Sequence, residues 1–271
     1  MKLSINNIVF NYGSKETLKD ITLEAEAGSI LGILGQNGCG KTTLLKCIDR
    51  MLKPQGGCVL IDSPTKDIFD EKTKVEDKDR VDIRDLSQKE MARGVAVVSQ
   101  SAYISFPFTA FDAVMMGRYA RLSGDPKKDR EAVIDSMRRS GSLEFAERVV
   151  SELSGGELRR VMIGRALAQE PNVLLLDEPT LHLDVNHQFD LMNLITELKK
   201  TNIVIVIVTH DLMFAARYCD KVILMNKGEI VSAGNTIDVL TSENIKELFE
   251  IDAVVEYDER VKGYNVVMIG R

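Results

Sequence analysis

Nine consecutive residues combine glycine, lysine and threonine at a fixed spacing: Gly35-Gln36-Asn37-Gly38-Cys39-Gly40-Lys41-Thr42-Thr43. A glycine, four residues and then Gly-Lys-Thr is the pattern of a phosphate-binding loop. Its glycines let the backbone wrap closely, so that N–H groups converge on phosphate oxygens. Lys41 is placed to reach the β- and γ-phosphates of a nucleotide, and the Thr42 hydroxyl to bind Mg²⁺. The motif alone does not separate a kinase, a GTPase and an ATPase.

The neighbouring segments supply the setting that this loop requires. The apolar run 29–34 predicts a buried strand before it, and the apolar spacing in 43–48 predicts a helix after it. A helix that begins near Lys41 directs its free N–H groups and the positive end of its dipole at the same place. The alternative, a glycine turn before an ordinary helix, is disfavoured because the full pattern stands between a strand and a helix.

A second helix start carries an unusual pair of glycines, in the sequence Leu153-Ser154-Gly155-Gly156-Glu157. Ser154 and Glu157 have the spacing of a capping box and predict a helix over 158–168. Two glycines in the first turn weaken a helix by about 1 kcal/mol each relative to alanine, which favours a place where something approaches the backbone. We therefore predict a second helix N-terminus that is open to an anion.

Polar side chains follow three predicted buried strands. Asp177 and Glu178 come directly after four large aliphatic residues, and Gln100 and His210 also stand at the ends of strand-like runs. Open α/β sheets bind ligands at the carboxyl ends of their strands. We expect Asp177 to orient Mg²⁺, Glu178 to polarise an attacking water, and His210 to reach a γ-phosphate.

Length and composition are those of a soluble globular protein. The chain has 271 residues, 44% of them hydrophobic and 28% charged, which suits one large domain or a domain with subdomains. The net charge of −6 and the pI near 5.3 argue against nucleic acid as the main partner. No apolar run approaches the roughly 18 residues of a membrane span, and the N-terminus lacks the apolar core of a signal peptide.

The four cysteines show no Cys-x-x-Cys spacing and are interpreted as free thiols in a reducing cytoplasm: Cys39, Cys47, Cys58 and Cys219. Cys39 stands in the phosphate loop near a helix N-terminus. Such a position is expected to lower the pKa of its thiol, so that alkylation there inhibits the protein and ATP protects it.

Other segments are predicted from periodicity and turn residues. They are strands at 2–10, 21–25, 57–62, 221–226 and 229–232, a short helix from 87, helical spacing at 129–139 and 143–150, a last helix at 236–249 and a closing hairpin around 258–260. Tyr12, in a turn ahead of the phosphate loop, is a candidate to stack on an adenine ring. The charged stretch 66–85 reads as a surface insertion. An aromatic cluster forms either core or a groove for a partner helix: Tyr103, Phe106, Phe108 and Phe111.

Taken together, these motifs resemble the ATP-binding cassette family over residues 1 to about 235. Six features stand in the family's order: the phosphate loop, Gln100, the signature Leu-Ser-Gly-Gly-Glu at 153–157, the acidic pair Asp177-Glu178, Asp184 and His210. Two stretches, 108–118 and 210–220, look most like the ATPase subunits of importers for ferric siderophores, haem and cobalamin. The charged insertion is longer than the family's usual turn, and His182 stands where relatives vary.

The resemblance implies an α/β fold. Its P-loop NTPase (RecA-like) core would be formed by 1–100 and 155–235, with an antiparallel β subdomain and an α-helical subdomain inserted at 101–154. Residues 236–271 would form a C-terminal extension of a helix and a β-hairpin.

The resemblance also implies that two copies form a homodimer that holds two ATP molecules. Each γ-phosphate would lie between Lys41 of one copy and Ser154 to Gly156 of the other. Glu178 would be the general base, with His210 and Lys41 as further catalytic residues, and Mg²⁺ would be served by Thr42, Gln100 and Asp177. The nucleotide-binding residues would be Tyr12, the whole loop from Gly35 to Thr43, Gln100, Ser154, Gly155, Gly156, Glu157 and Asp184.

Two functions follow from different classes of relative. The first is the ATPase subunit of an importer at the cytoplasmic face of the cell membrane, working with two membrane-spanning permease subunits and indirectly with a solute-binding protein. The permeases would be driven through a groove lined from the region after Gln100. The second is a soluble cassette ATPase of iron–sulfur cluster assembly. Co-purification with an integral membrane protein favours the first, and a soluble scaffold complex the second.

Overall fold

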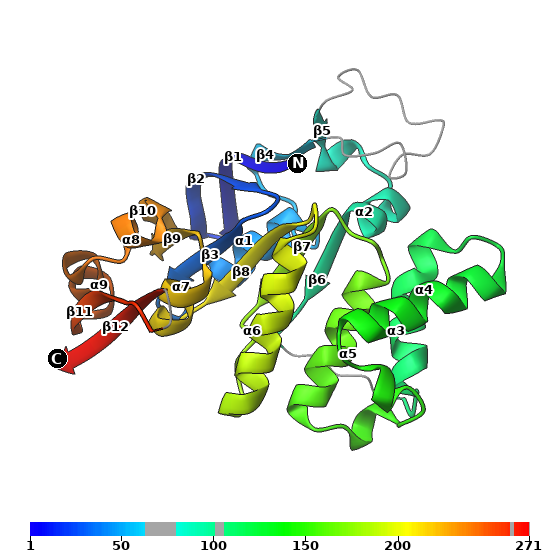
Figure 1. Cartoon of the computed structure of the whole chain (residues 1–271). Helices are drawn as coiled ribbons and strands as arrows, with labels where there is room; N and C mark the ends of the chain where they lie inside the picture. The colour runs from blue at the N-terminus through cyan, green and yellow to red at the C-terminus, as the bar shows by residue number, and fades with distance from the viewer. Residues whose placement is uncertain (63–79, 101–105, 261–262, 271) are drawn as a thin grey trace.

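A six-stranded sheet is the centre of the computed structural model, which describes residues 1–62, 80–100, 106–260 and 263–270 (Figure 1). All strands run parallel except β10, which is antiparallel to its neighbour β9. Their spatial order is β10 (Glu229–Asn235), β9 (Lys221–Asn226), β3 (Ile30–Gly35), β8 (Val204–Thr209), β7 (Val173–Asp177) and β6 (Val95–Val98). The predicted α/β class with a parallel sheet is confirmed.

The central strands are apolar along their whole length because both faces of the sheet are covered. In β7, Val173 and Leu175 join one hydrophobic cluster, while Leu174 and Leu176 join the other. The strand β8 alternates between the two clusters in the same way. Such doubly buried strands read as continuous aliphatic runs rather than as alternating ones, which is why the sequence marks them so clearly.

One face of this sheet packs against α1 (Lys41–Ile48) and a second, antiparallel sheet. The order of the second sheet is β2 (Lys15–Glu26), β1 (Lys2–Tyr12), β4 (Gly56–Asp62) and β5 (Arg80–Asp82). The strand that was predicted at 21–25 is β2, and it is longer than expected because it begins at Lys15. Of the charged insertion 66–85, residues 66–79 lie outside the described part of the chain. Its last three residues form a 3₁₀ turn, Ile83–Asp85. The helix α2 (Gln88–Gly94) follows, and its predicted capping box by Ser87 and Glu90 is confirmed.

The opposite face carries the remaining large helices in one hydrophobic cluster (Figure 1). They are α3 (Ala110–Arg118), α4 (Pro126–Arg139), α5 (Gly155–Leu167), α6 (Val185–Lys199) and α7 (Leu212–Tyr218). The helix α5 packs against α3 and α4, and it also contacts β6 and α6. The helix α6 was not predicted from the sequence. None of the helices in the described ranges is both long and apolar enough to cross a membrane.

The prediction of a helix at 143–150 is wrong. The structure has two short 3₁₀ turns there, Leu143–Phe145 and Val150–Glu152. The main chain between these turns bonds to another element instead of to itself. The carbonyls of Ala146 and Arg148 accept hydrogen bonds from the first N–H groups of α3, both at 2.9 Å. Of the aromatic cluster, Tyr103 lies outside the described residues; Phe106 is exposed and Phe111 packs against the core.

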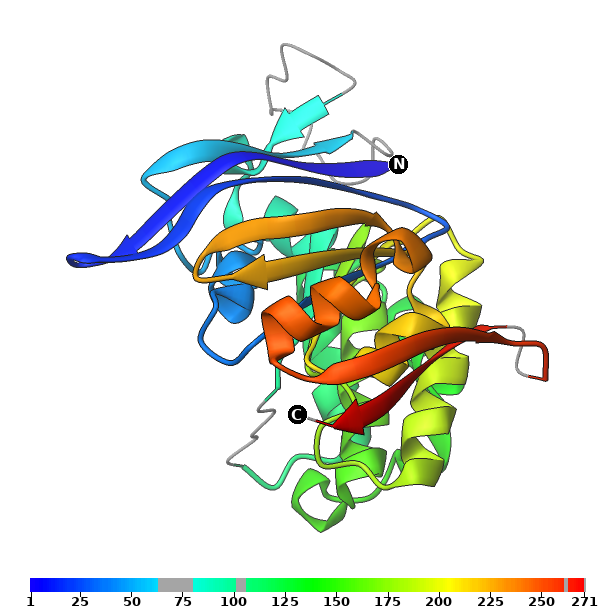
Figure 2. The ribbon, with the colours of Figure 1, turned by 90° about the vertical axis from the view of Figure 1, so that its left-hand side faces the viewer.

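The last segment forms a C-terminal extension beside β9 and β10, toward the viewer in Figure 2. The predicted single helix at 236–249 is wrong: α8 (Thr236–Val239) and α9 (Ser242–Phe249) are separate. The break occurs because the hydroxyl of Thr241 caps a new helix start, accepting from the N–H of Asn244 at 3.2 Å. The expected hairpin is present as β11 (Asp252–Asp258) and β12 (Gly263–Gly270).

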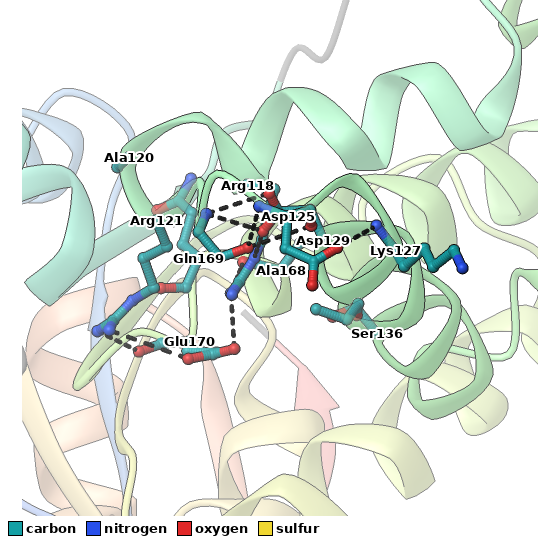
Figure 3. A network of polar contacts seen from close by, with 12 residues as sticks. Arg118, Ala120, Arg121, Asp125, Lys127, Asp129, Ser136, Ala168, Gln169 and Glu170 are labelled. Carbon is teal, nitrogen blue, oxygen red and sulfur yellow. Dashed lines mark hydrogen bonds and ion pairs between the residues drawn. The ribbon is translucent and has the colours of Figure 1, made fainter.

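A charged network attaches α3 and α4 to the segment that leads from α5 into β7 (Figure 3). Arg118, only 9% exposed, forms ion pairs with Glu170 (Nη1 to Oε1, 2.6 Å) and Asp129 (Nε to Oδ1, 3.3 Å). Close by, Arg121 donates to the main-chain carbonyls of Gln169 and Glu170 at 2.5 and 3.1 Å. Two arginines thus fix how the helical layer sits on the sheet.

Replacing Arg118 by leucine is expected to destabilise the fold by about 3 kcal/mol, because it leaves the carboxylate of Asp129, 4% exposed, buried without its cation. Urea unfolding followed by circular dichroism measures the change. Arg138→Leu is the matched control on α4, since its pair with Asp135 is exposed and is worth about 0.5 kcal/mol. Equal losses in the two variants would contradict the structural role of the buried pair.

Candidate functional site

A cleft of about 510 Å³ opens at the carboxyl ends of the parallel strands. Its volume falls within the range of small-molecule sites, about 300–1,000 Å³. Five segments of the chain meet there: the β1–β2 turn, the phosphate loop, the end of β6, the end of β7 and the end of β8. The lining residues are Tyr12, Lys15, Thr17, Asn37, Gly38, Gly40, Lys41, Thr42, Thr43, Gln100, Glu178, Leu181 and His210.

The phosphate loop needs glycine where its backbone passes close to other main chain. Gly35 has φ +157°, and a Cβ atom there would lie 2.3 Å from the carbonyl oxygen of Met225. Gly40, with φ +113°, caps α1, and its Cβ would lie 3.0 Å from the carbonyl of Thr17. Any side chain at these two positions would push the loop away from its neighbours, so the sequence pattern is a steric requirement of this turn.

Lys41 is the buried cation of the cleft. Its side chain is 7% exposed, and Nζ donates to the carbonyls of Gly35 at 2.6 Å and Gln36 at 3.1 Å. Because both partners are neutral, the positive charge remains available to an anion in the cleft. The side chain is thus oriented before any phosphate arrives.

The Asp177 carboxylate stands behind the cleft, next to Thr42. Thr42 Oγ1 donates to Asp177 Oδ1 at 3.3 Å. Burial raises the pKa of the Asp177 carboxyl, the hydroxyl of Thr42 lowers it, and the neighbouring Glu178 raises it again. A buried carboxylate beside a second carboxylate and a hydroxyl offers hard oxygen ligands to a cation. This donor set fits Mg²⁺, which prefers oxygen ligands and retains several waters.

Glu178 and His210 form a pair at the ends of β7 and β8. His210 Nδ1 lies 2.9 Å from both carboxylate oxygens of Glu178, which is 8% exposed. Glu178 adopts φ +47°, a left-handed conformation that is costly for a residue with a side chain. The hydrogen bond from its N–H to the carbonyl of Val208, 2.9 Å, holds it there. Non-glycine residues in such conformations cluster at functional sites.

Arg159 is a functional candidate that the sequence analysis missed. It lies on α5, five residues after Ser154, and is buried. Its guanidinium donates to the main-chain carbonyls of Ser99 at 2.9 Å and Gln100 at 3.3 Å. The segment that carries Gln100 into the cleft is therefore tied to the helix that starts at the double glycine. An arginine inside a helical pattern gives no local signal of this role, because its partners are about sixty residues away.

The sequence and the structure of this chain are similar to those of known proteins. The profile of the ABC transporter family matches residues 18–181, and an uncharacterised ABC transporter ATP-binding protein of Methanocaldococcus jannaschii is 39% identical over 270 residues, covering 99% of this chain and 98% of that protein. This chain belongs to the ABC transporter family. The iron(3+)-hydroxamate import ATP-binding protein of Bacillus subtilis is 32% identical over 262 residues, covering 95% of this cassette and 91% of the relative. A solved structure of an inward-facing transporter described as metal-chelate type has a TM-score of 0.79 at 26% identity, covering 99% of this cassette and 96% of that chain.

The signature of the cassette forms the predicted capping box. The hydroxyl of Ser154 accepts from the N–H of Glu157 at 3.3 Å, and Glu157 Oε2 accepts from the N–H of Ser154 at 2.7 Å. Gly156 is required within this chain, because a Cβ there would lie 2.3 Å from the ring of His187. A Cβ on Gly155 would meet nothing closer than 3.9 Å, so this chain leaves the backbone at Gly155 open.

Asp184 caps α6 and connects it to the signature. Its carboxylate accepts from the N–H of His187 at 2.9 Å and lies 2.8 Å from the ring nitrogen Nδ1 of the same histidine. The main-chain hydrogen bond from His187 is the largest cause that lowers the pKa of Asp184. The ring of His187 in turn covers Gly156. Two helix starts that are thirty residues apart are thereby locked together in the cassette.

The structure separates the sequence-predicted residues of the cassette into two groups. Those that line the cleft are Tyr12, Asn37, Gly38, Gly40, Lys41, Thr42, Thr43, Gln100, Glu178 and His210. Those that do not line it are Gly35, Gln36, Cys39, Asp177, Ser154, Gly155, Gly156, Glu157 and Asp184. The sequence analysis missed Lys15, Thr17 and Leu181, which also line the cleft. Lys15 and Thr17 could have been predicted, because they follow Tyr12 closely in the same β1–β2 connection.

The expected low pKa of Cys39 is wrong. Burial raises the pKa of its thiol, and this effect exceeds the lowering by the charge of Lys41. The side chain is turned into the core, where its sulfur would lie 2.7 Å from a Cβ placed on Gly35. The main-chain N–H groups of Lys41 and Cys39 also lower the pKa of this thiol, but burial is the largest effect and outweighs them.

Iodoacetamide is therefore expected to leave Cys39 untouched in the native cassette. Burial also raises the pKa of Cys47, to about 12, and that of Cys219, whereas Cys58 is half-exposed. At pH 8 we expect Cys58 to react at least about tenfold faster than the other three, because the thiolate is the reacting form. Peptide mass mapping measures this, with reaction in urea as the control in which all four are labelled. Equal rates at Cys39 and Cys58 in the native protein would contradict the burial of Cys39.

Proposed function

We propose that this cassette is the ATP-binding and hydrolysing subunit of an importer for an iron-siderophore, haem or cobalamin-type solute. The observation that carries the proposal is the cleft in which Lys41, Thr42, Glu178 and His210 converge. Support for the importer class comes from the iron(3+)-hydroxamate import relative, which this chain matches over nearly its whole length. The division into a core of 1–100 and 155–235, a helical subdomain at 101–154 and an extension from 236 is proposed with it.

In this proposal each group of the cleft has one task toward ATP. Tyr12 stacks on adenine, the loop N–H groups and Lys41 bind the phosphates, and His210 contacts the γ-phosphate while holding Glu178. Thr42, Gln100 and Asp177 hold Mg²⁺, whose charge neutralises the phosphate oxygens when it is bound. Glu178 takes the proton of the attacking water on its carboxylate.

The signature acts in a second copy of the chain. Ser154 and the open backbone at Gly155 do not line the cleft of their own chain. They stand at the beginning of α5, where main-chain N–H groups have no partner within the helix. In a head-to-tail homodimer they would close the partner's cleft over the γ-phosphate. The bond from Arg159 to Gln100 then lets the contents of one cleft influence the helix that closes the other.

A groove of about 490 Å³ is our candidate docking place for the membrane-spanning permease subunits. It lies at the end of α1, with Met51 72% exposed, and is lined by Asp49, Arg50, Met51, Gln88, Met91, Ala92, Val95, Val97 and Gln169. The helix α1 starts at Lys41, so a partner here touches the far end of the helix that faces the phosphates. The sequence analysis instead expected a groove lined from the region after Gln100, and the first residues of that region, 101–105, lie outside the described part of the chain.

Purification of the tagged full-length chain from its own cells, after mild detergent extraction, tests this function. We expect an integral membrane protein to be retained on the column, and the purified complex to hydrolyse ATP in the presence of Mg²⁺. Retention of a soluble scaffold complex instead would favour iron–sulfur assembly and overturn the importer proposal. A wild-type chain that binds no nucleotide would overturn the ATPase proposal itself.

A further inference from the structure

We propose that the C-terminal extension, residues 236–270, positions the phosphate loop through the side chain of Gln36. Nucleotide binding and the docking of α9 onto the cassette are then two linked events. This inference rests on the proposed ATPase function and assigns a role to a segment that the nucleotide cleft itself does not use.

The contact joins residues that are 212 positions apart in the sequence. Gln36 Nε2 donates to the main-chain carbonyl of Leu248 at 2.6 Å. Leu248 is in the last turn of α9, where carbonyl groups have no partner within the helix. The side chain of Gln36 therefore caps the C-terminal end of α9 from the phosphate loop. Gln36 does not line the cleft, so its contact with the nucleotide stays a prediction.

The main chain of Gln36 belongs to the cleft machinery at the same time. Its carbonyl accepts from Lys41 Nζ at 3.1 Å and from the N–H of Cys39 at 3.3 Å. One residue thus holds the buried lysine with its backbone and α9 with its side chain. A movement of α9 relative to the loop changes the place where Lys41 is held.

The extension is firmly seated, so it can act as an anchor. Ile245 and Leu248 of α9 are buried at 0% and 3% exposure, and Lys246 Nζ pairs with Asp252 Oδ1 at 2.6 Å. The hairpin that follows packs β12 against α7, the helix that begins just after His210 (Figure 2). The extension consequently contacts two elements next to the nucleotide site: the phosphate loop, through Gln36, and α7, which begins just after His210.

Linkage makes the coupling reciprocal. If a seated α9 holds the phosphate loop in the conformation that binds nucleotide, then bound nucleotide must stabilise the seating of α9 by the same factor. The extension would therefore report nucleotide occupancy to whatever contacts it.

Gln36→Met tests the proposal, because methionine has similar length and no N–H. Calorimetric titration of the full chain with MgADP is expected to give a Kd about three- to tenfold higher, which is the effect of one lost hydrogen bond. Hydrogen exchange of 242–249 is expected to slow on addition of MgADP in the wild type and not in the variant. Gln36→Lys, whose ammonium can donate to the same carbonyl, is expected to restore that protection.

Asn244→Ala is the matched control. Its side-chain amide donates to the carbonyl of Val239 at 2.7 Å, so the variant removes the same kind of bond near α9 without touching the loop. We expect a lower Tm and an unchanged Kd. An unchanged Kd in Gln36→Met, or an equal rise in Asn244→Ala, would overturn the coupling. In both outcomes wild-type binding of MgADP shows that the proposed function itself still stands.

Discussion

Glu178→Gln is expected to lower ATP hydrolysis by about 10²- to 10⁴-fold while ATP binding is retained. The amide keeps the shape of the side chain and can still meet the ring of His210, which lies 2.9 Å from both carboxylate oxygens. It cannot take the proton of the attacking water. Because Glu178 is held at φ +47° by its own main-chain hydrogen bond, we expect the substitution to leave the backbone in place.

Phosphate release by the purified protein and titration with MgATP measure the two quantities separately. Glu197→Gln is the control: it makes the same change on the exposed face of α6, where the carboxylate pairs with Lys200 at 2.6 Å. The homodimer proposal adds that MgATP converts the Glu178→Gln variant to a stable dimer, seen by light scattering. Unchanged turnover in Glu178→Gln would remove this residue from catalysis, and a strictly monomeric MgATP complex would contradict the shared site.

Lys41→Ala is expected to weaken MgATP binding by about ten- to a hundredfold, the effect of losing a charge-assisted hydrogen bond to phosphate. The expected loss is large because Lys41 is buried and held by the carbonyls of Gly35 and Gln36, so its charge is oriented before the nucleotide arrives. Alanine also leaves these two carbonyls without that donor, which loosens the loop.

Calorimetric titration with MgATP measures this loss. Lys46→Ala, on the same helix but outside the cleft lining, is the control for removing one positive charge, and we expect its Kd to change by less than about threefold. Equal weakening in the two variants would mean that the overall charge of α1, rather than the position of the Lys41 ammonium, governs binding.

Local patterns in the sequence predicted much of the scaffold and most of the cleft. The buried strands β7 and β8 were recognised because strands covered on both faces carry uninterrupted aliphatic residues. The capping box of Ser154 and Glu157 was recognised because both its hydrogen bonds join residues three positions apart. The missed helix α6 lacks such a box: its cap, Asp184, is followed at the third position by a histidine.

The errors at 143–150 and at Cys39 arose from contacts with distant parts of the chain. Residues 143–150 have helical spacing, yet the carbonyls of Ala146 and Arg148 bond to the start of α3. Cys39 stands beside a helix start, which favours a low pKa, but the fold turns its sulfur into the core and burial reverses the shift. In both cases the local pattern was present and tertiary packing outweighed it.

The sequence by itself determined which residues are the candidates for the chemistry: the phosphate loop with Lys41, the acidic pair after β7, the histidine after β8 and the double glycine of the signature. Only the tertiary structure decided how these parts are connected. Gln36 holds α9, Arg159 holds the segment of Gln100, and the ring of His187 covers Gly156. Motifs and caps depend on neighbours within a few residues, and periodicity shows them. The connecting bonds join segments from about thirty to more than two hundred residues apart, and their partners are mostly main-chain atoms that every residue possesses.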